Sequence, residues 1–214
     1  MSQALIIAVD GPAASGKGTI AARLAREYGL PHLDTGLLYR AVGYAAMRYN
    51  PPFDEAYAAM FAERAIPETL DNPGYRTAEA GEAASRVAAM PGVRAGLFRF
   101  QRKFAERPGG AVLDGRDIGT VIAPDAQAKL FVTASPEVRA ERRWRQVTAQ
   151  GQVITYEDML ADIIRRDERD AGRGAAPMVQ AEDAVLLDTT DMDIETAFDA
   201  ARRIVEAARA KHGL

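Results

Sequence analysis

Hydrophobic residues cluster into five short runs, separated by longer segments with helical spacing. The runs are Ala4–Val9, Pro31–Leu33, Ala111–Leu113, Lys129–Thr133 and Ala184–Leu187. They are short and β-branched and lack polar alternation, which is typical of strands buried on both faces. Strands that alternate with helices predict an α/β fold, in which a parallel sheet lies between two layers of helices.

Carboxylates directly follow several of these runs. Asp10, Asp114 and Asp188 each stand at the point where an apolar run ends. In a parallel sheet the ligand site lies beyond the carboxyl ends of the strands. We therefore expect the three acids to direct the polar chemistry to one edge of the sheet.

The clearest helical pattern lies near the C-terminal end. Apolar residues from Ile194 to Ala208 recur at the i, i+3, i+4 spacing and form one stripe, and Asp193 is a candidate N-cap. We expect this helix to pack on the sheet as scaffold.

A long insertion interrupts the alternation between about Tyr39 and Arg107. It has helical rather than strand patterns and is too long for an ordinary crossover. We interpret it as a small accessory lobe of several helices. The breaks between them are expected at Asn50-Pro51-Pro52, Ile66-Pro67, Asp71-Asn72-Pro73-Gly74 and Met90-Pro91-Gly92.

Composition narrows the classes of function. The 214 residues, 48% hydrophobic and 27% charged, indicate a globular chain. The absence of cysteine excludes disulfides, thiol nucleophiles and thiolate-bound metals, and two histidines are too few for a multi-histidine metal site. There is no signal-peptide pattern and no apolar stretch that could span a bilayer, so we expect a cytoplasmic protein.

The net charge and the arginine content point to different kinds of ligand. The net charge of −3 provides no general attraction to nucleic acid or to anionic membranes. Of the 27 basic residues, however, 23 are arginine. Arginine binds phosphate through two parallel hydrogen bonds, but codon usage in an alanine-rich chain explains the bias equally well.

The segment after the first run carries the most specific motif. It reads Gly11-Pro12-Ala13-Ala14-Ser15-Gly16-Lys17-Gly18-Thr19 and has the Gly-x-x-x-x-Gly-Lys spacing of a phosphate-binding loop. In such loops backbone N–H groups surround the phosphates, the lysine reaches the β and γ oxygens, and the following helix points its positive end at the anion. A helix is expected from about Gly18 to Tyr28.

One position departs from the usual motif. Gly18 stands where a serine or threonine normally binds Mg²⁺. Either Thr19 takes part in binding the metal, through water, or nucleotide oxygens and water hold it. A GTPase would need an Asn-Lys-x-Asp motif, and neither Asn50 nor Asn72 lies in that context.

Two further segments contain candidate phosphate or metal contacts. In the first, Asp34 and Thr35 suit the cap of a helix that begins near Gly36, or Thr35 and Arg40 instead bind a second phosphate group. In the second, Asp114 is placed to hold Mg²⁺ through water. Arg116 and Asp117, two and three residues on, either bind substrate or pair with each other.

Arginines also gather in two helical segments on either side of Gly151. Arg166, Asp170 and Arg173 share one face if their helix continues far enough. The pattern fits a lid that closes over phosphate, but interleaved acids are equally typical of a solvated surface. The other members are Arg139, Arg142, Arg143 and Arg145, and the interleaved acids are Asp162, Asp167 and Glu168.

Taken together, these segments resemble the bacterial cytidylate kinase family over nearly the whole chain. The most specific stretch is Asp-Gly-Arg-Asp-Ile-Gly-Thr-Val at 114–121, supported by Arg-Arg-Asp-Glu-Arg-Asp at 165–170. The resemblance implies a single kinase domain with a P-loop NTPase core and a five-stranded parallel sheet. The core would comprise residues 1–35, 108–140 and 175–214, with a monophosphate-binding lobe at about 36–107 and a lid at about 141–174.

The resemblance also implies a reaction and a set of site residues. The reaction is transfer of phosphate from ATP to CMP or dCMP with Mg²⁺. The catalytic residues that it implies are Lys17, Arg116, Arg166 and Arg169. The residues that it implies for ATP binding are Gly11–Thr19, Arg142 and Arg143. For the acceptor it implies Thr35, Arg40, Ser85, Arg94, Asp114, Asp117, Arg166, Asp170 and Arg173, of which Ser85, Arg94 and Asp117 read the cytosine. Many family members carry a β-sheet insert in the lobe, whereas Asn50 to Tyr75 is shorter here and lacks that pattern.

Two other hypotheses remain open. The first is a different small-substrate kinase on the same core, such as an adenylate, shikimate or gluconate kinase. The second is a nucleotide-binding switch that hydrolyses ATP slowly. We expect a monomer that binds small nucleotides and neither nucleic acid nor membrane, because the arginine cluster has only Trp144 as an interleaved aromatic.

Overall fold

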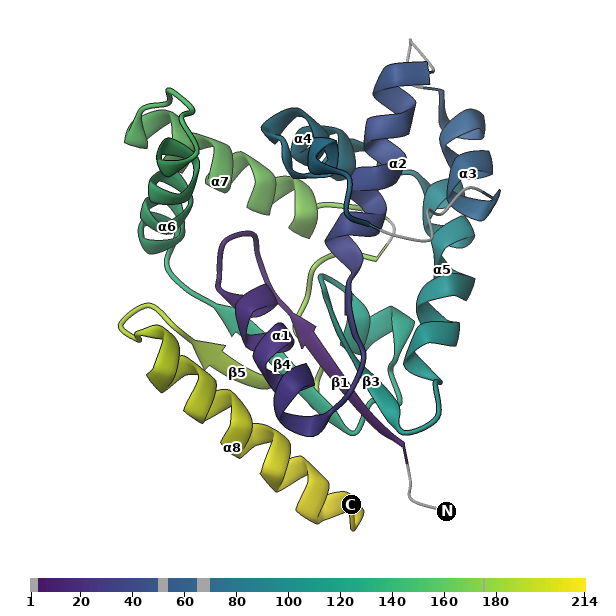
Figure 1. Ribbon diagram of the computed structural model, residues 1–214, viewed down its shortest axis with the longest axis vertical. Helices are drawn as coiled ribbons and strands as arrows, with labels where there is room; N and C mark the ends of the chain where they lie inside the picture. Colours follow the sequence, from purple (N-terminus) through teal and green to yellow (C-terminus); the bar gives the residue numbers. More distant parts are fainter. Residues whose placement is uncertain (1–3, 50–53, 65–69, 175) are drawn as a thin grey trace.

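A computed structural model describes residues 4–49, 54–64, 70–174 and 176–214 (Figure 1). Its centre is a parallel five-stranded sheet with the strand order β2-β3-β1-β4-β5. Each of the five predicted runs overlaps one strand. The strands are β1 (Leu5–Asp10), β2 (His32–Asp34), β3 (Gly110–Gly115), β4 (Ala128–Thr133) and β5 (Val185–Asp188).

Alternate residues of β1 belong to different hydrophobic cores. Leu5, Ile7 and Val9 pack with apolar residues of α1 (Lys17–Tyr28) and α8 (Ile194–His212). Ile6 and Ala8 pack on the opposite face with residues of α2 (Thr35–Tyr49) and α5 (Pro91–Ala105). Because successive side chains of a strand point to opposite faces, a strand without polar alternation needs cover on both sides. The predicted arrangement of helices on both faces is therefore confirmed.

The edge strand β5 is not covered on both faces. Val185 and Leu186 in β5 are 47% and 54% exposed, and only Leu187 is buried. Burial on both faces was the wrong expectation for this strand, since among the described residues β5 pairs with β4 alone. The predicted scaffold helix is confirmed as α8 with Asp193 as N-cap, but Ile194 is 60% exposed and lies outside its apolar stripe.

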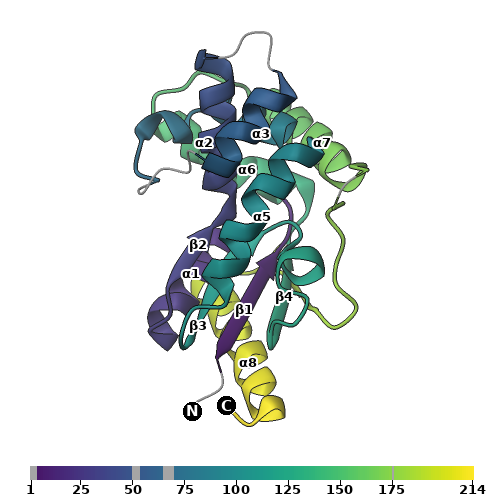
Figure 2. The same ribbon diagram turned by 90° about the vertical axis from the view of Figure 1, so that its right-hand side faces the viewer.

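The predicted accessory lobe is helical throughout its described residues. It comprises α2 (Thr35–Tyr49), α3 (Glu55–Arg64), the short helix η1 (Pro73–Arg76), α4 (Ala78–Val87) and α5 (Pro91–Ala105). The breaks predicted at 71–74 and 90–92 are confirmed, while those at 50–52 and 66–67 lie outside the described residues. In Figures 1 and 2 these helices stand above the sheet.

Helices α6 (Pro136–Ala149) and α7 (Tyr156–Ala171) form the predicted pair of arginine-bearing segments. Ser135 and Thr155 cap them, each accepting a backbone N–H. The two helices enclose a small apolar core of their own, and Ala13 of the phosphate loop belongs to it. The helix pair is therefore packed directly on that loop, beside the lobe (Figure 1).

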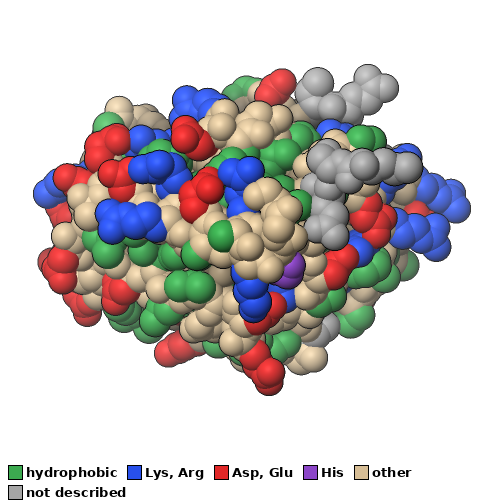
Figure 3. All heavy atoms as spheres, turned by 90° about the horizontal axis from the view of Figure 1, so that it is seen from below, with side chains coloured by type: hydrophobic (Ala, Val, Ile, Leu, Met, Phe, Trp, Pro, Cys, Tyr) green, Lys and Arg blue, Asp and Glu red, His purple; other side chains and the backbone are tan. Residues whose placement is uncertain are grey.

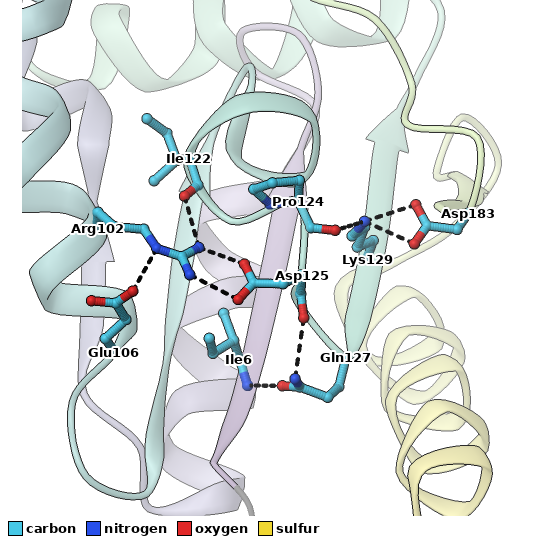
Figure 4. Close-up of polar contacts among 9 residues, drawn as sticks. All are labelled: Ile6, Arg102, Glu106, Ile122, Pro124, Asp125, Gln127, Lys129 and Asp183. Atoms are coloured by element: carbon cyan, nitrogen blue, oxygen red, sulfur yellow. Dashed lines mark hydrogen bonds and ion pairs between the residues drawn. The ribbon is translucent and has the colours of Figure 1, made fainter.

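Polar contacts secure the connection between β3 and β4, which contains the short helix η2 (Ile118–Ile122). Arg102 of α5 binds Asp125, and Lys129 donates to the Pro124 carbonyl at 2.6 Å and to Asp183 at 2.9 Å (Figure 4). Seen from below, basic and acidic side chains are interspersed over this end of the molecule (Figure 3). Within the described ranges, no helix is both long and apolar enough to cross a bilayer.

Candidate active site

A cavity of about 1190 Å³ lies between the carboxyl edge of the sheet, the lobe and the α6–α7 pair. Each of these three parts contributes lining residues. It is therefore larger than a typical site for one small ligand, which is roughly 300–1,000 Å³.

The phosphate loop forms one wall of this cavity, and its shape depends on glycine. Gly11 has φ +145°, and a Cβ there would lie only 2.0 Å from the Val132 carbonyl oxygen. Gly16 has φ +88° and caps α1. Ala13 to Thr19 line the cavity, whereas Gly11 and Pro12 lie outside the lining set and shape the loop from behind.

Three carbonyls of this loop are bound by side chains. Lys17 Nζ donates to Pro12 O at 3.2 Å, Arg139 Nη1 to Ala13 O at 3.3 Å, and Thr189 Oγ1 to Ser15 O at 3.1 Å. Holding the carbonyls in this way leaves the loop N–H groups as donors for an anion. Arg139 was expected only as a member of the arginine-bearing segments and Thr189 was not expected at all, since neither belongs to the motif.

Lys17 is buried among other cations. Burial, with a contribution from Arg116, lowers the pKa of Lys17 to about 7, while Asp114 and Asp34 oppose that shift. A polyanionic ligand would remove the cost of charging this ammonium group. The side chain is therefore placed to gain most from a bound phosphate.

Two carboxylates face the phosphate loop from neighbouring strand ends. Asp34 and Asp114 both line the cavity, and burial together with Asp114 raises the pKa of Asp34. His32 Nε2 lies 2.8 Å from Asp114 Oδ1. A Cβ at position 18 would lie 3.7 Å from Asp114 Oδ2, so this acid stands beside the position where other P-loops carry their hydroxyl.

The expected gathering of strand-end acids is confirmed only in part. Asp114 lines the cavity, but Asp10 accepts backbone N–H groups of η2, and Asp188 is exposed and accepts the Thr190 N–H. Asp34, which the sequence indicated only as a cap, does cap α2 through the Leu37 N–H at 3.3 Å and lines the cavity as well. Its position at a strand end was the signal that could have found it.

The structure limits the roles that the sequence left open for Thr35 and Arg40. Thr35 does not cap α2; its Oγ1 donates to the Asp114 carbonyl at 2.8 Å. Arg40 lines the cavity and donates to the Tyr75 and Thr77 carbonyls at 2.9 and 3.0 Å. Thr35 is thus fixed to the core, whereas Arg40 is fixed within the lobe.

Two of the three residues that the resemblance implies for cytosine line the cavity. Ser85 and Asp117 line it, whereas Arg94 is outside the lining set and forms an ion pair with Asp117. Burial raises the pKa of Asp117, and Arg94 opposes the rise. Asp117 pairs with Arg94 and not with its neighbour Arg116, so the alternative of a local Arg–Asp pair is wrong.

Guanidinium groups cover the side opposite the phosphate loop. Arg116 Nε donates to Asp170 at 2.9 Å, and although burial alone would raise the pKa of Asp170, Arg116 and Arg166 hold it below its usual range. Burial and Arg116 lower the pKa of Arg166 to about 10. Among the described residues, Arg166 Nε and two nitrogens of Arg173 have no hydrogen-bond partner. Buried donors without a partner are costly, so these groups are placed for an anion.

The remaining arginines divide between cavity and surface. Arg142 donates to Thr189 O at 2.7 Å and Arg143 to Gln146 at 2.9 Å, and both line the cavity, as does Arg169, which pairs with Glu82 of the lobe. Arg145 is exposed and pairs with Glu141. Helix α7 ends at Ala171, so Arg173 reaches the cavity from beyond the helix and not along its face.

A phosphate loop at the carboxyl edge of a parallel sheet, faced by several arginines, defines a P-loop phosphotransferase. A family model described as cytidylate kinase matches residues 7–208. The chain therefore belongs to the cytidylate kinase family.

Known proteins resemble the chain over nearly its full length. A cytidylate kinase of Caulobacter sp. (strain K31) is 63% identical over 211 residues, which cover 98% of each chain. One from Xanthobacter autotrophicus is 64% identical over 206 residues, covering 96% of this chain and 99% of the relative. A solved structure of an uncharacterized protein from Eubacterium ventriosum has a TM-score of 0.59 at 16% identity, covering 96% and 99%, and shows the shared fold alone. The same holds for a putative kinase from Chloroflexus aurantiacus, with a TM-score of 0.51, 15% identity and coverage of 97% and 99%.

Proposed function

We propose that the chain transfers the γ-phosphoryl group of ATP to CMP or dCMP and releases ADP and CDP or dCDP. Family membership indicates this activity. The main structural observation in support of this activity is that the phosphate loop lines the same cavity as Arg166 and Arg173, which have buried nitrogens without a hydrogen-bond partner among the described residues. Such a cavity offers cationic groups to phosphates from both sides.

ATP would bind on the side of the phosphate loop. Backbone N–H groups between Ala13 and Thr19 surround its phosphates, and Lys17 reaches the β and γ oxygens. Arg142 and Arg143 line the adjoining part of the cavity on α6 and complete the donor site.

The acceptor would lie between the lobe and the arginine wall. Thr35, Arg40 and Arg166 place its phosphate, and Asp170 and Arg173 hold the sugar and phosphate. Asp117, with Arg94 behind it, accepts from the exocyclic amino group of cytosine, and Ser85 lies beside them. The Oγ of Ser85 is buried and has no partner among the described residues, which leaves it for a ligand.

The transfer needs positioning more than proton chemistry. An oxygen of the acceptor phosphate, already ionised, attacks the γ-phosphorus, and the bond to the oxygen bridging β and γ breaks as ADP leaves. Lys17, Arg116, Arg166 and Arg169 neutralise the charge that spreads over the transferred group. Enclosure between the lobe and α6–α7 excludes water, which would otherwise accept the phosphoryl group.

The site is suited to Mg²⁺ that is held by few ligands from the protein. Within the described chain no cluster of three or more acids and histidines forms a metal cage. Asp34 and Asp114 nevertheless repel each other beside the phosphate loop, and Thr19 lines the same wall. These residues would hold Mg²⁺ partly through water, as this ion prefers. When bound, it supplies charge neutralisation on the nucleotide phosphates.

A panel of acceptors tests the proposal. ADP release from ATP should be fastest with CMP or dCMP and slower with UMP and AMP. Lys17→Ala should lower turnover by roughly a hundredfold or more at unchanged fold, because the ammonium acts on the transition state. Faster turnover with AMP would contradict the specificity, and slow ATP loss that no monophosphate accelerates would favour a nucleotide-binding switch.

A further inference from the structure

A buried carboxylate connects the two nucleotide sites without lining either. Asp10 ends β1, directly before the phosphate loop, and is 5% exposed. Its Oδ1 accepts the Ile118 N–H at 2.8 Å and its Oδ2 accepts the Gly119 N–H at 2.7 Å. These two N–H groups follow Asp117 directly in the chain. One carboxylate therefore joins the root of the phosphate loop to the segment that carries the proposed cytosine-reading acid.

The surroundings of Asp10 are built to receive both of its oxygens. A Cβ at Gly119 would lie 3.4 Å from Asp10 Oδ2 and 3.2 Å from Lys129 Cδ. Lys129 cannot easily yield, because its ammonium group is held by the Pro124 carbonyl and by Asp183 (Figure 4). A larger residue at position 119 would thus press on Lys129 and lie in van der Waals contact with the carboxylate.

The same contacts determine where Asp117 lies. Its carbonyl accepts the N–H groups of Val121 and Ile122 at 2.9 and 3.1 Å, and its carboxylate pairs with Arg94 of α5. Asp10 holds the next two N–H groups of the chain. Since the backbone of η2 is held at its start by Asp10, the position of Asp117 relative to the phosphate loop is set by that carboxylate.

A charged group at this place is costly, which argues against a role as general packing. Burial raises the pKa of Asp10 to about 6; the Gly119 and Ile118 N–H groups oppose the rise, Asp117 adds to it and Lys17 opposes it. An asparagine would fill the same space, but its amide nitrogen cannot accept the second N–H. Both N–H groups are satisfied only by the carboxylate.

We propose that Asp10 is a positioning residue for base recognition, which fixes Asp117 at the distance from the phosphate loop that a cytosine nucleotide requires. It thereby sets the preference for CMP over UMP. This inference rests on the proposed role of Asp117 as the acid that accepts from the cytosine amino group.

Steady-state kinetics of Asp10→Asn with CMP, UMP and ATP test the inference. The KM for CMP should rise about tenfold, and the ratio of kcat/KM for CMP over UMP should fall about tenfold, as expected for a buried N–H left without an acceptor. The KM for ATP should stay within about twofold. Asp188→Asn is the matched control, because Asp188 also ends a strand but is exposed and accepts only from Thr190. It should leave all three values unchanged.

Two further variants separate the possible failures. Gly119→Ala crowds Lys129 and places a methyl group against the same carboxylate, so it should lower the CMP preference in the same direction. This test applies also if Asp10→Asn does not fold. If both variants lose thermal stability but keep the wild-type CMP/UMP ratio, Asp10 is only structural and the inference is overturned. If Asp117→Asn itself leaves the ratio unchanged, the proposed role of Asp117 fails, and the inference fails with it.

Discussion

At the scale of single residues, burial holds charged groups in states that they would not adopt in water. The pKa of Lys17 is lowered to about 7 and that of Asp10 is raised to about 6, in both cases chiefly by burial. A phosphate ligand would offset the cost at Lys17. Asp10 is not among the lining residues of the cavity, so its cost persists when substrates bind and should be visible in the unfolding equilibrium.

The pH dependence of stability measures that cost. The folded pKa of Asp10 lies above its unfolded value of 3.8, so the folded state binds more protons in this window. The contribution of Asp10 to stability is present below pH 3.8 and is lost as pH rises through about 6. In urea titrations the free energy of unfolding of wild type should fall relative to Asp10→Asn by about 1 kcal/mol between about pH 5 and pH 7. Parallel curves for the two proteins would contradict the shift.

At the scale of elements, α6 and α7 are tied to the phosphate loop and not only hinged beside it. Arg139 donates to the Ala134 carbonyl at 2.8 Å, to the Ala13 carbonyl at 3.3 Å and to Asp167 of α7 at 3.0 Å. Ala13 also belongs to the apolar core of the helix pair. The conformation of the loop and the position of the helix pair are therefore coupled.

Removing the acid of this pair should weaken the coupling. Asp167→Asn leaves the buried Arg139 without its counter-charge, so we expect a loss of about 1–3 kcal/mol in the free energy of unfolding and a several-fold higher KM for ATP. Glu141→Gln on α6 is the control, because its pair with Arg145 is exposed and worth at most about 1 kcal/mol. Equal effects of the two variants would show that Arg139 does not couple these elements.

At the scale of the whole molecule, three parts enclose one cavity, and contacts bridge them. Arg169 of α7 pairs with Glu82 of α4 at 2.9 Å, and Arg116 at the end of β3 pairs with Asp170 of α7 at 2.9 Å. These pairs connect the lobe, the core and the α6–α7 pair around the proposed substrates. Binding of both nucleotides should accordingly hold the three parts together.

Hydrogen exchange should report this closure. With CMP and a non-hydrolysable ATP analogue together, amide exchange in α4 and α7 should slow by about tenfold or more, because local opening of these helices would break contacts to both ligands. Exchange in the second half of α8, which packs on the sheet away from the cavity, should slow much less. Uniform slowing along the chain would instead indicate stabilisation without closure.

The extent to which the sequence predicts the structure differs between these scales. The strand positions, the phosphate loop and the helical lobe follow from local patterns, because hydrophobic spacing and glycine placement act within a few residues. The place of Asp34 in the cavity lining, and the contacts of Thr189 and Arg139 with the phosphate loop, were missed, since each depends on residues distant in the chain. Similarly, Ser85 and Arg94 read as ordinary helix residues, and only the resemblance to a family singled them out.

The sequence by itself determined the α/β class, the phosphate loop and the family to which the chain belongs. These properties are encoded in short segments whose spacing is restricted by backbone geometry. Only the tertiary structure decided that Asp10 binds η2 and not a ligand, that Asp117 pairs with Arg94 and not Arg116, and that Ala13 packs within the α6–α7 core. Those outcomes depend on which strand ends and helices come together in space, and a one-dimensional pattern does not contain that information.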